Sequence, residues 1–374
     1  MNIALIHDWL RVNAGSEKVV SEILSMYKEE QIDLYTLFNK LSADENQEIL
    51  QGAPCHTSWM QYVPYINKIY KVLLPLMPFA IQHLKVKDAE IYISSSHAIA
   101  KGFKHPKHQL HICYCHTPMR YAWYLNEDYL ENFSGFKLWL IRKILPFIRR
   151  WDLKSATQVH YFIANSKHIQ QQIKAIYQRD AVVIYPPVKT TKFVLNNNPR
   201  QAFYLAVGRF VPYKKMDIII NAFKQMPDKK LVLIGDGYDR KNIKKLIYQK
   251  PNIIWLGYQH DDELILYMQN AQACIFAAKE DFGIMCVEAQ STGTPVLALN
   301  YGGYRETVID GTTGYFFEEQ TAAAIQKVVM KFEQAPLVNH LVISQHAARF
   351  SAAHFKQSFQ QFVSEQFALF KKQS

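Results

Sequence analysis

One short stretch of the sequence holds two glutamates whose type and spacing could do chemistry. Glu280 and Glu288 lie eight positions apart in "AAKEDFGIMCVEAQSTGTPVLAL", residues 277–299. The apolar run before Glu280 predicts a buried strand, the segment from Ile284 to Gly293 predicts a helix, and "PVLAL" predicts another buried strand. Glu280 would then follow the carboxyl end of a strand. At that edge of an open α/β sheet ligands bind, and helix N-termini offer free N–H groups to phosphate.

A carboxylate beside a phosphate site must face groups that donate hydrogen bonds, and sugar hydroxyls are such donors. One interpretation is that Glu280 and Glu288 bracket a phosphorylated sugar compound. The alternative is that Glu280 caps the helix and Glu288 is exposed to solvent. This stretch alone leaves both interpretations open.

A pair of basic residues occurs in a similar place earlier in the chain. In "FYLAVGRFVPYKKMDIIINAF", Arg209 comes just after a predicted strand and Lys214 begins a predicted amphipathic helix. Arginine can bind a diphosphate bidentately while lysine adds a point charge. The pair is either a diphosphate site or two cations on the surface.

The elements that would position these residues alternate between strand and helix. Predicted strands in the first half are "IALIH", "DLYTLF", "IYISSS", "HICYCH" and "YFIANS", and in the second half "FYLAVG", "KLVLIGDG", "NIIWLG", "CIFAA" and "PVLAL". This alternation predicts an α/β fold with parallel sheets and helices on both faces. The alternation is interrupted near residues 186–200 by prolines, threonines and asparagines, which predict a hinge there. Two doubly wound domains would then flank a cleft, the expected site.

Length and composition agree with two soluble domains. The chain has 374 residues, of which 49% are apolar and 20% charged, and two domains are the natural expectation. It contains no run of 18 uncharged apolar residues, so we expect neither a signal peptide nor a spanning helix. The five cysteines lie mostly in apolar contexts, which predicts reduced thiols in a cytoplasmic protein.

The formal net charge of +11 calls for an anionic partner. Nucleic acid, an anionic membrane or a phosphorylated substrate would satisfy it. No nucleic-acid-binding module is recognised, and we expect no nucleic-acid partner. The basic segment 137–154 carries Leu138, Ile141, Leu145 and Ile148 at helical spacing, and it is either a membrane-surface helix or a domain helix with a basic solvent face. A second apolar stretch from Tyr70 is too short to span a bilayer.

Several motifs, in order, resemble the nucleotide-sugar half of a retaining glycosyltransferase of family 4 with the GT-B fold. They are "VGRFVPYKKMDIIINAF", "LVLIGDGYD", "IIWLGYQHDDEL", "EDFGIMCVEAQSTGTPVLA" and "YGGYRETVIDGTTGYFF". The first half, through "IHDWLRVNAGSEKV", "SSSHAIAKGF", "HICYCHTPMRYAW" and "FIANSKHI", resembles bacterial mannosyltransferases that build O-antigen and exopolysaccharide repeat units.

The resemblance implies a domain organisation. An acceptor-binding Rossmann-like domain would span residues 1–190, and a nucleotide-sugar-binding Rossmann-like domain would span 191–355. Residues 356–374 would form a C-terminal helix that packs back on the first domain.

The resemblance also implies a role for each matching residue. Arg209 and Lys214 would hold the donor diphosphate and neutralise the leaving nucleotide. Glu280 would accept hydrogen bonds from the sugar hydroxyls, and Glu288 would bind the ribose diol. The backbone N–H groups that would meet sugar or phosphate belong to Phe282, Gly283 and Ile284.

In the first half, the resemblance points to His116 and Gly15. His116 would lie near the transferred sugar. Gly15 would let the backbone approach the diphosphate or acceptor closely. The family often has two glycines there, and Ala14 replaces the first.

The implied reaction is hexosyl transfer with retention, with GDP-mannose as the expected donor and a polyprenyl-diphosphate-linked glycan as the acceptor. We expect no cofactor and no metal requirement, because the cleft segments contain no Asp-x-Asp motif and the basic pair can supply a metal's charge. The Cys113, Cys115 and His116 motif lacks a second ligand pair, so we expect no metal there either. The enzyme would be cytoplasmic and peripheral at the inner face of an anionic membrane. Alternatives are a UDP- or dTDP-sugar donor, a sugar-nucleotide hydrolase or epimerase, and a non-catalytic sugar-nucleotide-binding subunit.

Overall fold

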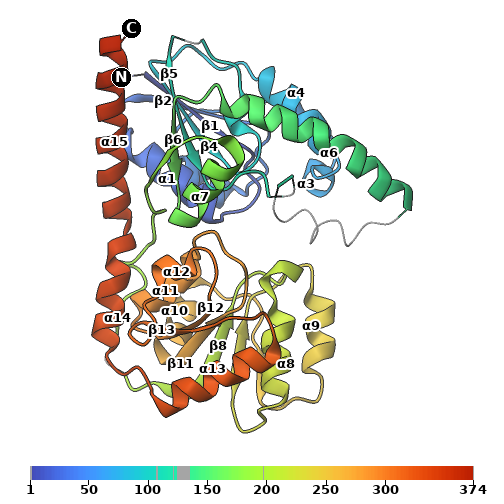
Figure 1. Cartoon of the computed structure of the whole chain (residues 1–374), viewed down its shortest axis with the longest axis vertical. Helices are drawn as coiled ribbons and strands as arrows, with labels where there is room; N and C mark the ends of the chain where they lie inside the picture. The colour runs from blue at the N-terminus through green and yellow to red at the C-terminus, as the bar shows by residue number, and fades with distance from the viewer. Residues whose placement is uncertain (1, 107, 121, 124–134, 197, 374) are drawn as a thin grey trace. The chain divides into compact units, whose positions relative to one another are not determined.

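The chain forms two parallel β-sheets, each in a compact unit of its own (Figure 1). The computed structural model describes residues 2–106, 108–120, 122–123, 135–196 and 198–373. Unit 1 comprises residues 1–187 and 353–374, and unit 2 comprises residues 188–352.

The sheet of unit 1 has seven strands in the order β3-β2-β1-β4-β5-β6-β7, and every neighbouring pair is parallel. The strands are β1 (Asn2–His7), β2 (Gln31–Thr36), β3 (Cys55–Thr57), β4 (Ile91–Ser96), β5 (Leu110–Cys115), β6 (Tyr161–Ala164) and β7 (Ala181–Val183). The central strands are buried on both faces, which explains why they read as nearly continuous apolar runs.

Helices cover both faces of this sheet (Figure 1). One face packs against α1 (Gly15–Met26) and α15 (Ala352–Gln373), and the other against α4 (Met77–Gln82) and α6 (Gly135–Ala156). The other helices are α2 (Ala43–Leu50), η1 (Trp59–Tyr62), α3 (Ile66–Ile69), η2 (Leu74–Leu76), η3 (Ala100–Gly102) and α7 (Lys167–Tyr177).

The sheet of unit 2 has six parallel strands in the order β10-β9-β8-β11-β12-β13. Its strands are β8 (Gln201–Val207), β9 (Leu231–Ile234), β10 (Ile253–Trp255), β11 (Ala271–Phe276), β12 (Val296–Leu299) and β13 (Gly314–Phe317). Its helices are η4 (Pro212–Lys214), α8 (Met216–Lys224), α9 (Arg240–Ile247), α10 (Asp261–Asn270), α11 (Ile284–Ser291), α12 (Tyr304–Thr307), α13 (Ala322–Gln334), α14 (His340–Ala347) and η5 (Ala348–Phe350).

The predicted fold class is confirmed: both units are Rossmann-like, with parallel sheets covered by helices. Each of the ten predicted strands overlaps an observed strand. The sequence interpretation missed β3, β7 and β13, which are only three or four residues long. Lys214 ends the short helix η4 and so lies before α8, where an immediate helix start was predicted.

Each sheet has a point where the strand order reverses. In unit 1 this point lies between β1 and β4, and in unit 2 it lies between β8 and β11. Connections leave toward opposite faces there, which opens a crevice at the carboxyl ends of the two strands. His7 is the last residue of β1, and Glu280 lies in the segment that follows β11, so each residue lies near one of these points.

The apolar positions of the basic helix α6 pack into unit 1. Ile148 is buried in the core beside α4, and Leu145 packs against the same core. Leu138 and Ile141 are partly buried. The helical spacing of these four residues therefore reflects packing within the domain at least in part. Other apolar side chains of α6, such as Trp139 and Phe147, are exposed.

Candidate functional site

Lys214 and Glu280 form an ion pair at the carboxyl edge of the unit 2 sheet. The Lys214 ammonium lies 2.5 Å from Oε1 of Glu280, and the two side chains are 20% and 15% exposed. Burial disfavours the charge on Lys214, but the neighbouring Glu280 carboxylate outweighs this effect and the pKa of Lys214 is raised. The residues predicted to hold phosphate and sugar are thus direct neighbours, because β8 and β11 are adjacent strands.

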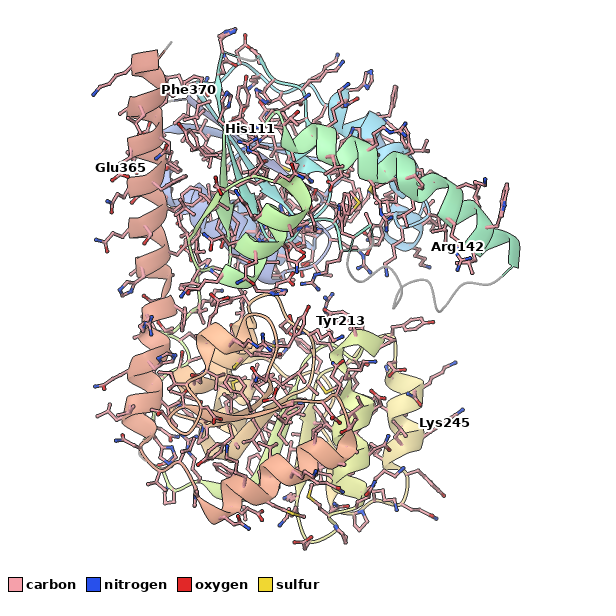
Figure 2. The ribbon with its side chains drawn as sticks, viewed as in Figure 1. His111, Arg142, Tyr213, Lys245, Glu365 and Phe370 are labelled. Carbon is pink, nitrogen blue, oxygen red and sulfur yellow. The ribbon has the colours of Figure 1, made fainter. Side chains whose placement is uncertain are left out.

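Arg209 lies on a backbone segment that packs tightly against a glycine loop. Its side chain is exposed, and Nη2 donates to the Tyr213 hydroxyl at 3.4 Å. Figure 2 shows Tyr213 in the turn before α8. A Cβ at Gly237 would come within 2.6 Å of the Phe210 carbonyl oxygen, and one at Gly235 within 1.9 Å of the Gly208 carbonyl oxygen. The "GDG" turn therefore positions the Arg209 backbone, a role that the sequence interpretation did not assign to it.

Helix α11 begins just after Glu280, with a glycine at its N-cap position. This N-cap residue, Gly283, has φ +88°, a left-handed conformation that favours glycine. On the same helix Glu288 is only 3% exposed. The alternative interpretation placed Glu288 in solvent, and on that point it is wrong. The N–H groups in the first turn of a helix suit an anion.

A second glycine loop supports the Glu280 segment from behind. The N–H of Gly303 donates to the Glu280 carbonyl oxygen at 3.0 Å. A Cβ at Gly303 would lie 2.2 Å from Cα of Phe282, and one at Gly283 would lie 2.6 Å from the ring of the buried Tyr304. The close packing explains why glycine is required at position 303.

In unit 1, His116 lies beside two polar residues from neighbouring strands. Nε2 of His116 is 2.8 Å from the Ser95 hydroxyl, and that hydroxyl is 3.2 Å from Nδ1 of His7. Burial, together with the charges of His97 and His7, holds the pKa of His116 well below its usual range. All three residues follow the alternate positions that face α1, which brings them together at the strand ends.

Asp8 and His97 belong to the same cluster and were missed in the sequence interpretation. The Asp8 carboxylate accepts four backbone hydrogen bonds, from residues 97 to 100, at 2.6–3.0 Å. Nδ1 of His97 lies 2.9 Å from the same carboxylate. Burial opposes ionisation of both groups, but their mutual contact lowers the pKa of Asp8 and raises that of His97. The available signal was that β1, β4 and β5 each end at or next to a histidine.

Gly15 begins helix α1, close to this cluster. The helix has Ala14 as its N-cap, with no side-chain capping hydrogen bond. Glu17 in the first turn is 3% exposed, and its Oε1 lies 3.9 Å from Nε2 of His7. The role predicted for Gly15 stays a prediction.

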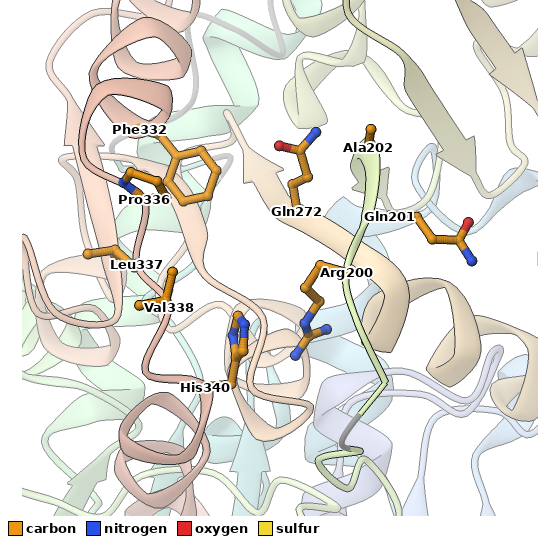
Figure 3. Close-up of a pocket in the computed structure, with 9 residues that line it drawn as sticks. All are labelled: Arg200, Gln201, Ala202, Gln272, Phe332, Pro336, Leu337, Val338 and His340. Atoms are coloured by element: carbon orange, nitrogen blue, oxygen red, sulfur yellow. The ribbon is translucent and has the colours of Figure 1, made fainter.

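A cavity of about 290 Å³ in unit 2 lies elsewhere (Figure 3). Its lining includes Gln201 and Gln272, which lie at the amino ends of β8 and β11. The Arg200 guanidinium at its edge donates to the Met268, Gln269 and Thr292 carbonyl oxygens and to the Thr294 hydroxyl. With its donors committed in this way, Arg200 acts as a structural cross-link, and we assign the cavity no ligand.

Unit 2 matches a known family. The family model described as "Glycosyl transferases group 1" matches residues 187–353, so this part of the chain carries a glycosyl transferases group 1 domain. An uncharacterized glycosyltransferase of Methanocaldococcus jannaschii is 32% identical over 180 residues, which are 47% of this chain and 50% of that protein. The lipopolysaccharide 1,2-N-acetylglucosaminetransferase of Salmonella typhimurium is 32% identical over 180 residues, 40% of this chain and 47% of that protein. The chain spans about half the length of the curated relatives it matches.

Solved structures extend the similarity in fold to nearly the whole chain. Anabaena HepE in complex with UDP aligns with a TM-score of 0.72 at 17% identity, over 98% of this chain and 100% of that structure. The lipopolysaccharide outer core galactosyltransferase WaaB aligns with a TM-score of 0.67 at 17% identity, again over 98% and 100%. The chain therefore has the GT-B fold.

Proposed function

We propose that this protein is a retaining, metal-independent glycosyltransferase of family 4 that transfers a hexosyl unit from a sugar nucleotide to an acceptor hydroxyl. The observation that carries the proposal is the Lys214–Glu280 pair inside a glycosyl transferases group 1 domain. One side chain offers a cation to phosphate, and its neighbour offers a carboxylate to sugar hydroxyls. A sugar nucleotide needs both groups at the point where its sugar joins its diphosphate.

The proposed chemistry breaks the bond between the anomeric carbon and the diphosphate oxygen. The acceptor oxygen bonds to the same face of that carbon, and its proton passes to the departing phosphate oxygen. Arg209 and Lys214 neutralise the charge that grows on the leaving nucleotide. Glu280 holds the sugar hydroxyls, and the buried Glu288 binds the ribose diol. The two cations supply positive charge that a metal ion would otherwise supply.

The proposed donor is GDP-mannose, and this choice depends on the resemblance of the first half to mannosyltransferases. The similar structures named above favour other donors, since HepE binds UDP and UDP-glucose and WaaB is a galactosyltransferase. A UDP-sugar is therefore the main competing donor. His116 is proposed to contact the transferred sugar.

The proposed acceptor is a polyprenyl-diphosphate-linked glycan at an anionic membrane surface. None of the helices within the described ranges combines the length and apolar content needed to cross a bilayer. Unit 1 instead exposes an aromatic surface, defined by Trp59, Tyr62, Tyr65, Val72, Leu76 and Phe79. Exposed apolar patches often mark sites that contact a membrane or another protein.

Charge around the aromatic surface supports an anionic lipid as its partner. Residues 51–87 contain four lysines and neither aspartate nor glutamate. Lys68 and Lys71 are exposed between the apolar side chains. Arg142 on α6, labelled in Figure 2, is also exposed in this unit. Apolar rings flanked by basic residues are typical of helices that lie in the membrane interface.

Nucleotide release by purified protein tests the function. A panel of GDP-, UDP-, ADP- and dTDP-sugars would be incubated in EDTA with and without a membrane lipid extract. Lipid-dependent release of GDP from GDP-mannose, abolished by Glu280→Ala, is the expected result. Release from another donor would overturn the choice of mannose. Binding of a donor without any release would instead support a non-catalytic subunit.

A further inference from the structure

The hydroxyl of Ser95 lies between two histidine side chains. It is 3.2 Å from Nδ1 of His7 and 2.8 Å from Nε2 of His116. All three side chains are almost fully buried, so each hydrogen atom in this chain of contacts needs a partner. The positions of these hydrogens determine what His116 can offer to a ligand.

The first hydrogen belongs to His7. Its Nδ1 also lies 3.0 Å from the backbone carbonyl oxygen of Ser95. A carbonyl oxygen can only accept, so Nδ1 of His7 must carry a hydrogen. This holds whether His7 is neutral or charged, and it means that Nδ1 cannot accept a hydrogen bond from the Ser95 hydroxyl.

The second hydrogen belongs to the Ser95 hydroxyl. With Nδ1 of His7 excluded, Nε2 of His116 is the one acceptor in hydrogen-bond contact with this hydroxyl among the described residues. If Nε2 of His116 carried a hydrogen, two donors would face the same oxygen and the serine hydrogen would be buried without an acceptor. That arrangement costs free energy, so Nε2 of His116 carries no hydrogen and accepts the hydrogen bond from the Ser95 hydroxyl.

We propose that Ser95 and His7 are positioning residues that hold His116 as a neutral imidazole with its proton on Nδ1. Neutral histidine in water carries its proton mostly on Nε2, so the cluster reverses the ordinary preference. The nearby groups whose charge acts on His116 are His97, His7 and Asp8. Burial and the two histidines oppose a second proton on His116, in agreement with the neutral form.

This tautomer defines what His116 can do. The described residues supply no hydrogen bond to Nδ1 of His116. His116 therefore presents an N–H donor and no basic nitrogen. If the proposed function holds, this donor contacts an oxygen of the transferred sugar, and His116 cannot take the proton of the acceptor hydroxyl.

The ¹⁵N spectrum of histidine-labelled full-length protein tests the tautomer without any substrate. A His116→Gln variant identifies the His116 signals by their loss. We expect Nδ1 of His116 to show the shift of a protonated nitrogen and Nε2 that of an unprotonated one at neutral pH. A protonated Nε2, alone or together with Nδ1, would overturn the proposal.

Variants separate this positioning role from a general structural one. Ser95→Ala should return His116 toward the Nε2-protonated form. His7→Asn, which keeps an N–H near the place of Nδ1, should preserve the tautomer better than His7→Leu. The matched control is Ser94→Ala, because Ser94 makes a similar 2.8 Å contact with Nε2 of His111. It should alter the His111 signals alone, and a change at His116 in this control would contradict the proposal.

Activity then gives an independent readout. Ser95→Ala should lower kcat/KM for the active donor roughly five- to tenfold, the effect of losing one hydrogen bond. If no donor is turned over but the tautomer is as expected, the proposed function fails and the positioning role stands. If the tautomer differs from the expected one but turnover occurs, the positioning role fails and the proposed function stands.

Discussion

The Lys214 ammonium and the Glu280 carboxylate lie 2.5 Å apart, on segments that follow the adjacent strands β8 and β11 of the unit 2 sheet. Each side chain neutralises the other in the absence of ligand. A sugar nucleotide would bring phosphate to the cation and hydroxyls to the carboxylate, so both charges would keep a partner when the ligand binds. Under the proposed function, the pair would therefore act both as a stabilising contact and as a preorganised pair of ligand-binding groups.

Replacing Glu280 with glutamine should affect activity far more than stability. The variant keeps the shape of the side chain but loses the charged partner of Lys214, and under the proposed function it would also lose the charged hydrogen bonds to sugar. We expect kcat/KM to fall about 100-fold, which corresponds to the loss of charged hydrogen bonds. Steady-state nucleotide release and thermal unfolding of the same preparation measure the two effects.

The matched control for Glu280 is Asp261→Asn, which removes an exposed ion pair with Lys192 in the same unit. Exposed pairs contribute little, so activity should stay within twofold of the wild type. Equal losses in both variants would mean that the Glu280 effect is a general consequence of removing a charge.

Asp8 should be a stability residue whose contribution depends on pH. Its carboxylate accepts four backbone hydrogen bonds, and asparagine could accept only part of them. We expect Asp8→Asn to lower the free energy of unfolding by about 3 kcal/mol. Five of the six tryptophans lie in unit 1, so tryptophan fluorescence in urea reports on this unit.

The pKa of Asp8 is lowered in the folded protein. Its contribution is therefore present above the unfolded-state pKa of about 4 and is lost as pH falls through the folded-state pKa. The difference between wild type and Asp8→Asn should shrink in acid. Asp180→Asn, at an exposed ion pair with Lys174 in the same unit, is the control and should change stability much less. A constant difference down to low pH would contradict the ionised state of Asp8.

The sequence predicted the segments well because buried parallel strands and amphipathic helices carry strong local patterns. Arg209, Lys214 and Glu280 could be placed at strand ends for the same reason. The contact between Lys214 and Glu280 could not, because it requires β8 to lie beside β11, and strand order is a property of the whole sheet.

The unit 1 cluster illustrates the same limit. His7, Ser95 and His116 come from β1, the end of β4 and the residue after β5, which are separated by long stretches of chain.

The basic helix α6 shows a different limit. Apolar side chains at helical spacing mark a buried face, but the spacing does not say whether a protein core or a membrane buries it. In α6, Ile148 packs into the core.

Replacing Gly303 with alanine should disturb the Glu280 loop through steric contact. The new Cβ would lie 2.2 Å from Cα of Phe282, so the backbone there must move. A displacement of about 1 Å at a donor-binding loop can cost about 100-fold in kcat/KM. Titration of donor binding by calorimetry, together with turnover, measures the change.

Gly311→Ala provides the comparison for Gly303. Gly311 has φ +73° and open space around its Cβ position, so alanine adds backbone strain of about 1 kcal/mol without a clash. It should lower stability slightly and leave donor binding intact. Normal donor binding in Gly303→Ala would show that the Glu280 loop tolerates the shift.

The aromatic surface of unit 1 should determine binding to anionic vesicles. Tyr62 and Val72 are 84% and 78% exposed, so serine at both positions removes apolar area without disturbing the core. We expect the double variant to bind vesicles of phosphatidylglycerol and phosphatidylcholine at least tenfold more weakly, because each buried apolar side chain contributes about 1.5–3 kcal/mol. Sedimentation with vesicles at low and high salt measures this loss, and the contribution of Lys68 and Lys71 should weaken with salt.

Tyr238→Ser, at an 89% exposed tyrosine in unit 2, is the control and should bind like the wild type. Undiminished binding of the double variant would show that another surface, such as the exposed side of α6, makes the contact.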